Sequence, residues 1–71
     1  MQPEDLIKLV TWKMPYGKYK GLTLCDLPEH YVGFIALKML PQGELGQLIL
    51  LLNEMQINGL MGLLKPLKEK R

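Results

Sequence analysis

Few residues of this sequence could carry out covalent or acid-base chemistry. The chain has no serine, and it has one histidine (His30), one cysteine (Cys25) and one arginine (Arg71). A Ser-His-Asp site, a Cys-x-x-Cys redox pair and a Cys/His zinc cluster are therefore excluded within one chain. Cys25 and His30 formally offer a nucleophile and a base, but a small buried thiol and a surface imidazole explain them more simply. We predict no catalytic residue, no metal and no cofactor.

The acidic residues are not spaced for hydrolysis either. Glu44 and Glu54 fall on the solvated side of a predicted helix, whereas Asp26 and Glu29 lie at a predicted helix start, where the helix dipole favours acids. A chain of 71 residues, of which 48% are hydrophobic, supports one small core, and a deep catalytic cleft would remove part of it. We therefore expect a single domain over residues 1–71 that is not an enzyme.

One stretch combines basic, aromatic and glycine residues. The net charge of +2 is too small to indicate a nucleic-acid partner, but three lysines fall within residues 13–20 with no acid among them. In such a turn, glycines let backbone N–H groups approach a phosphate, lysines supply charge and tyrosines offer faces for base stacking. The candidate nucleic-acid or anion-binding residues are Lys13, Tyr16, Gly17, Lys18, Tyr19, Lys20 and Gly21.

The same residues also suit an ordinary β-hairpin. Glycines allow positive φ angles, lysines protect an edge strand and tyrosines cover a core. Residues 13–16 are predicted to be extended, residues 17–21 to form a turn and residues 22–24 to form the return strand. Pro15 lacks an N–H donor and limits the ladder to a few bonds. Both interpretations of this stretch remain open.

The rest of the chain is predicted to be helical, because it has sixteen leucines against eight β-branched residues. We expect helices to start at Pro3 and near Pro28, and the longest helix to run from 44 to 58 and end at Gly59. A last helical segment should be kinked or split at Pro66. The predicted fold is small α+β and mainly helical, with three to four helices packed around one core and a short β-hairpin near residues 13–24.

Two of these helices carry apolar residues on a second side. Phe34 and Leu37 lie away from the predicted core face of their helix, and Leu50 and Ile57 lie away from the main stripe of the longest helix. Neighbouring helices could cover these side chains, or a second copy of the chain or another protein could do so. Phe34, Leu37, Leu50 and Ile57 are therefore the candidate residues of a protein interface.

The sequence carries no targeting or membrane signal. The first five residues, Met-Gln-Pro-Glu-Asp, carry two acids where a secretory signal needs positive charge. The longest apolar run covers only residues 48–52, against the ~20 residues that span a bilayer. A lone cysteine fits a reducing compartment. We expect a cytoplasmic protein without a membrane partner.

Several short motifs, in this order and spacing, resemble a family of short bacterial proteins of unknown function. Some members are labelled putative quorum-sensing-regulated virulence factor. The resemblance covers residues 13–67 and implies no established activity. The motifs that carry it are residues 14–22, Asp26-Leu27-Pro28, Tyr31, residues 43–46 and Asn58-Gly59-Leu60.

Residues 14–22 and the helix start at Leu27-Pro28 are also similar to the C-terminal module of exodeoxyribonuclease X-like bacterial exonucleases. This similarity covers about the first half of the chain and leaves out the nuclease domain, so it implies an accessory role beside enzymes that act on DNA. We predict a non-catalytic module that contacts nucleic acid without sequence specificity. The alternative is a protein-protein interaction or homodimerising adaptor that uses the second apolar helix face.

Overall fold

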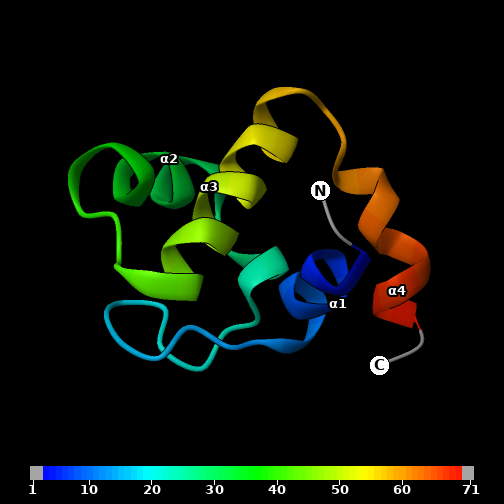
Figure 1. The fold of residues 1–71 in the computed structure, drawn as a ribbon, viewed down its shortest axis with the longest axis horizontal. Helices are drawn as coiled ribbons and strands as arrows, with labels where there is room; N and C mark the ends of the chain where they lie inside the picture. Colours follow the sequence, from blue (N-terminus) through cyan, green and yellow to red (C-terminus); the bar gives the residue numbers. More distant parts are fainter. Residues whose placement is uncertain (1–2, 70–71) are drawn as a thin grey trace.

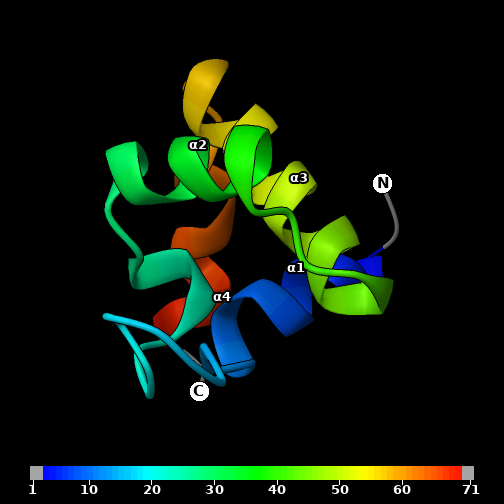
Figure 2. The same cartoon turned by 90° about the vertical axis from the view of Figure 1, so that its left-hand side faces the viewer.

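The fold is an arrangement of short helices, which the computed structural model describes over residues 3–69. In Figure 1, α2 and α4 lie on opposite sides of the molecule, with α1 and α3 between them, and Figure 2 shows the molecule from the side of α2. α1 and α3 contact each other and most of the remaining elements. The elements are α1 (Pro3–Thr11), the 3-10 helix η1 (Leu24–Asp26), α2 (Glu29–Lys38), α3 (Gly43–Ile57), the 3-10 helix η2 (Met61–Leu64) and α4 (Lys65–Glu69).

One hydrophobic cluster holds these elements together. α3 contributes its main apolar stripe, because residues three and four apart lie on one side of a helix. α1 contributes Leu9 and Val10, and α2 contributes Val32 and Ile35. Gly59, with φ of +68°, follows α3 and ends the helix as predicted. The buried cluster consists of Leu9, Val10, Met14, Leu24, Cys25, Leu27, Val32, Ile35, Leu48, Ile49, Leu52, Met55 and Leu64.

Close backbone contact joins the first turn of α3 to the loop that follows α2. A Cβ atom on Gly46 of α3 would lie 2.0 Å from the carbonyl oxygen of Pro41 in this loop, so only glycine fits at position 46. Further along, a Cβ on Gly33 of α2 would lie 3.7 Å from Oδ1 of Asn53, which is ordinary contact distance. α2 and α3 pack against each other along this side.

An ion pair joins α1 to the start of α3. The Lys8 ammonium donates a hydrogen bond to the carboxylate of Glu44, and this bond together with the charges of Glu44, Asp5 and Glu4 raises the pKa of Lys8 above its usual 10.5. Lys8 also lies 5.8 Å from the centre of the Trp12 ring, within cation-π range. Both side chains of the pair remain partly exposed to water.

The predicted α+β fold with a β-hairpin near residues 13–24 is wrong, because residues 3–69 contain helices and no strand. The segments before and after the predicted turn meet in a single antiparallel bridge between Lys13 and Thr23. Beyond it the pairing stops on both sides. Pro15 has no N–H to donate, and Leu24 already starts the 3-10 helix η1. The segment is a closed loop rather than a two-stranded ladder.

Three apolar residues, at positions 39, 60 and 63, are exposed although regular helical spacing would place each beside buried neighbours. α2 ends at Lys38, so Met39 leaves the helix and is 63% exposed. Leu60 and Leu63 are also exposed, because the chain after Gly59 forms the 3-10 helix η2, in which residues three apart share a side. The split predicted at Pro66 occurs just before it, where η2 passes into α4.

No helix within residues 3–69 combines the length and the apolar character needed to cross a membrane.

Candidate functional site

The lysine loop, which we define as residues 13–21, is closed at its base by backbone hydrogen bonds. The Met14 N–H donates to the carbonyl of Leu22 and the Gly21 N–H donates to the carbonyl of Met14, both at 2.8 Å. The Met14 side chain is buried at this base. The loop projects from one edge of the molecule in both views (Figures 1 and 2).

The charged side chains of the loop face water. Lys13, Lys18 and Lys20 are exposed, and no ion pair joins any of them to a carboxylate within residues 3–69. Tyr16 is 48% exposed. The structure thus brings three unpaired ammonium groups and one accessible aromatic side chain onto a single short loop.

Tyr19 has a different place from Tyr16. Its ring packs edge-to-face against Tyr31 of α2, with 4.5 Å between the ring centroids, and the Lys18 ammonium lies 5.6 Å from the Tyr19 ring centre. Gly17 has φ of +85°, and a Cβ there would lie 3.0 Å from the Tyr31 hydroxyl oxygen. Tyr19 and Gly17 therefore hold the loop against α2, which leaves Tyr16 as the aromatic side chain available for stacking.

The second candidate surface is the apolar face, which we define as Phe34, Leu37, Leu50 and Ile57. All four side chains are exposed, with Leu37 at 82% and Ile57 at 69%. Phe34 and Leu37 lie on α2, Leu50 and Ile57 lie on α3, and these two helices pack against each other. Neighbouring helices of the same chain do not cover these residues.

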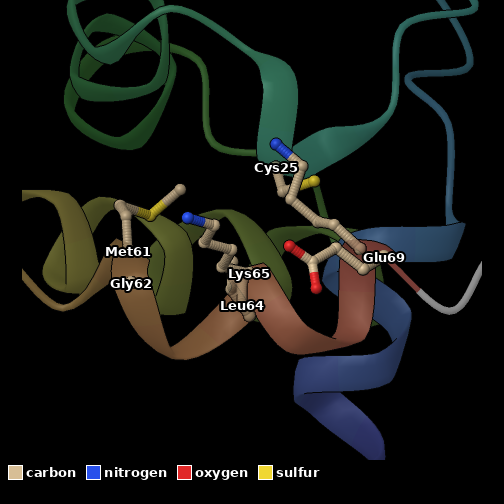
Figure 3. A pocket seen from close by; sticks show the side chains of 7 residues that line it. Cys25, Met61, Gly62, Leu64, Lys65 and Glu69 are labelled. Carbon is tan, nitrogen blue, oxygen red and sulfur yellow. The ribbon is translucent and has the colours of Figure 1, made fainter.

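Cys25 lies beside a cavity of about 610 Å³ between η1 and the η2–α4 segment. In Figure 3, Lys65 and Glu69 project into this space from α4, facing Cys25 on η1. The Cys25 thiol is buried and lies 3.8 Å from Oδ1 of Asp26, which pairs with Lys68 at 3.0 Å. His30 is not among the residues that line the cavity, so it does not join Cys25 there.

Among the residues that line two smaller cavities along α3, sequence reasoning singled out only Leu50 as a candidate functional residue. Glu54 was assigned to the solvated side of its helix, yet it borders both cavities, and Asp5 of α1 borders one of them. The helical position of Leu51 beside Glu54 is the sequence signal that could have indicated an apolar groove with a charged edge. Within residues 3–69 no group of three or more His, Cys, Asp or Glu side chains could hold a metal ion.

Comparison with known proteins identifies one family. Residues 2–67 match the family described as "Putative quorum-sensing-regulated virulence factor". Relatives from Escherichia coli K12 and O157:H7, each named "Uncharacterized protein YpeB", are 44% identical to this chain over 69 residues, which is 96% of each protein. No solved structure matches the chain. These matches confirm the first resemblance in the sequence and do not support the second, to the exonuclease module.

Proposed function

This chain belongs to the family described as "Putative quorum-sensing-regulated virulence factor", and we propose that it is a non-catalytic binding module that contacts nucleic acid without sequence specificity. The observation that supports this proposal is the exposure of Lys13, Lys18 and Lys20, without an ion pair in the described chain, on one closed loop. Neutralisation of phosphates by lysine supplies most of the affinity in sequence-independent binding.

The shape of the loop favours single strands over duplexes in this proposal. Tyr16 is exposed at the loop, and a base stacked on an aromatic side chain contributes roughly 1–3 kcal/mol. A duplex keeps its bases stacked on each other and cannot use this contact. Tyr19 supports the loop through Tyr31 and contributes to binding only by holding the lysines in place.

We would test this proposal by titrating labelled single- and double-stranded DNA and RNA into isotope-labelled protein at low salt. Amide signals of residues 13–24 should shift, and the logarithm of the binding constant should fall against the logarithm of salt concentration with a slope near −2 to −3, as expected for about three lysine contacts. If no amide between residues 13 and 24 shifts, the proposal is wrong.

Charge-matched variants separate the loop from the overall charge of the protein. Replacing Lys18 and Lys20 by Gln should reduce the salt slope by about two, because each phosphate contact contributes about one. Replacing Lys38 and Lys65 by Gln removes the same charge from α2 and α4 and should leave the slope unchanged. Equal losses in the two double variants would show that binding follows net charge and not this loop.

A second candidate function is a homodimer formed through the apolar face. The observation that favours it is the exposure of all four of its side chains on two helices that lie side by side. Contiguous exposed apolar surface on a small protein commonly marks an interface, and most homodimers pair the same patch from both copies.

The oligomeric state tests this second candidate. Light scattering should show a rising mass with concentration, and replacing Leu37 and Ile57 by Lys should return the protein to monomer without changing its helix content. A monomer at up to ~1 mM would remove the homodimer proposal and leave the nucleic-acid proposal unaffected.

A further inference from the structure

A groove with acidic edges runs along α3. It consists of two cavities, of about 300 and 250 Å³, that share Leu51 and Glu54. Its accessible apolar side chains are Leu50, Leu51 and Leu60, and the buried Leu48 and Met55 lie beneath them. Asp5 of α1 borders one cavity. Leu50 also belongs to the apolar face. We call this surface the acidic groove. None of its residues belongs to the lysine loop.

The length and lining of the acidic groove suit a short helix. The lining residues of α3 extend from Gln47 to Asn58, which at 1.5 Å per residue corresponds to roughly 16 Å, or three helical turns. Helices that bind in grooves insert apolar side chains spaced at i, i+3 or i+4, and i+7, a span of two turns. The two adjoining cavities together extend over this length of α3.

The charges around the acidic groove determine the sign of the charge that a partner must carry. Asp5 and Glu54 have no ion pair within residues 3–69. The nearby cation Lys8 is already paired with Glu44. The carboxylates therefore repel phosphate and acidic segments and attract lysine and arginine side chains.

We propose that the acidic groove binds a cationic amphipathic helix of a partner protein, with apolar side chains over Leu51 and basic side chains beside Asp5 and Glu54. This inference is independent of the nucleic-acid proposal, because the two use different residues and ligands of opposite charge. The chain would then hold a basic partner on α3 while the lysine loop remains free.

The test uses a synthetic fourteen-residue peptide with leucines at helical spacing and lysines on both flanks of that stripe. Titrated into isotope-labelled protein, it should shift amides between residues 47 and 60 and not those of the lysine loop. A peptide of the same pattern with glutamates in place of the lysines should bind at least roughly tenfold more weakly, because both carboxylates of the groove would then repel it. A scrambled Leu/Lys peptide without an apolar side should not produce the same shifts.

Matched variants assign the effect to the groove. Replacing Asp5 by Asn and Glu54 by Gln together should weaken binding of the Leu/Lys peptide roughly three- to tenfold, as expected for two partly exposed charge contacts. Replacing Glu29, an exposed acid at the start of α2, by Gln should not change it. Replacing Leu51 by Asn should also weaken binding, whereas removing lysines from the loop should not.

Three outcomes would overturn this inference. Equal binding of the lysine and glutamate peptides would show that charge plays no part. Shifts confined to residues outside 47–60 would place the peptide elsewhere. Concentration-dependent shifts of the same amides without any peptide, if they persist after Leu37 and Ile57 are replaced by Lys, would assign the groove rather than the apolar face to a second copy of the chain.

Discussion

Gly17 and Gly21 bound the turn of the lysine loop, and the two glycines are constrained differently. Both have positive φ, of +85° and +89°, a region that costs other L-residues roughly 1–2 kcal/mol. Gly21 has open space where a Cβ would stand, whereas at Gly17 the Tyr31 hydroxyl oxygen lies 3.0 Å away. Gly17 therefore combines a backbone requirement with a packing requirement, and Gly21 has only the first.

We predict that Gly17→Ala lowers the free energy of unfolding more than Gly21→Ala does. The Gly21 variant should lose about 1 kcal/mol through its backbone angle alone, and the Gly17 variant should lose about 1 kcal/mol more because Tyr31 must move. Urea unfolding of the two variants measures the difference. Equal losses would mean that the Tyr31 ring moves aside without cost.

Residue type alone identified the candidate functional residues, but not the contacts that each of them makes. The glycines, lysines and tyrosines of the loop were identified from the sequence. That Tyr19 is packed while Tyr16 is exposed depends on Tyr31, which lies twelve residues after Tyr19 in the chain. Asp5 and Glu54 lie on different helices, so nothing local indicates that they border the same groove. Such pairings depend on tertiary contacts.

At the scale of elements, hydrophobic spacing predicted helices well where they were long and failed where the chain changed geometry. The main stripe of α3 faces the core, and α3 begins and ends one residue before the predicted limits. The predicted hairpin was wrong, because strand pairing cannot extend from the single bridge past Pro15 or into η1. After Gly59, apolar residues at α-helical spacing do not share one buried side, because the 3-10 helix η2 has three residues per turn. Short segments therefore depend more on their neighbours than on periodicity.

Two helical glycines should respond to alanine with opposite signs. Alanine in a helix interior is normally favoured over glycine by up to about 1 kcal/mol, so Gly33→Ala, which meets only ordinary contact distances, should stabilise the protein. Gly46→Ala places a Cβ 2.0 Å from the Pro41 carbonyl oxygen and should instead destabilise it by roughly 3 kcal/mol or more. Thermal unfolding of both variants checks the prediction, and a neutral Gly46→Ala would show that the Pro41 turn is free to shift.

For the whole molecule, one buried cluster takes side chains from every described element except α4, whose Leu67 packs against it partly buried. The core contains side chains from α1, η1, α2, α3 and η2. The apolar face and the acidic groove leave further leucine and isoleucine surface in water on α2 and α3. A small chain has few buried side chains, so each one matters for stability. We expect stability to depend mainly on α3, because this helix contributes both to the core and to the exposed apolar surface.

Leu52, which is fully buried on α3, should therefore report on the whole molecule. We expect Leu52→Ala to cost about 2–5 kcal/mol and to shift the loss of helix and the Trp12 fluorescence change together, because one core unfolds as a unit. Leu50→Ala, at an exposed position of the same helix, should cost far less. Separate transitions for the two signals would contradict a single cooperative core.

The closed base of the lysine loop affects how fast and how tightly it binds. Because hydrogen bonds among Met14, Gly21 and Leu22 already join the two arms, folding fixes the backbone of the loop before any ligand arrives. Binding then loses conformational entropy mainly in the lysine side chains, and not in the main chain. Opening the base should slow productive encounters and shorten the lifetime of the complex even if every lysine is kept.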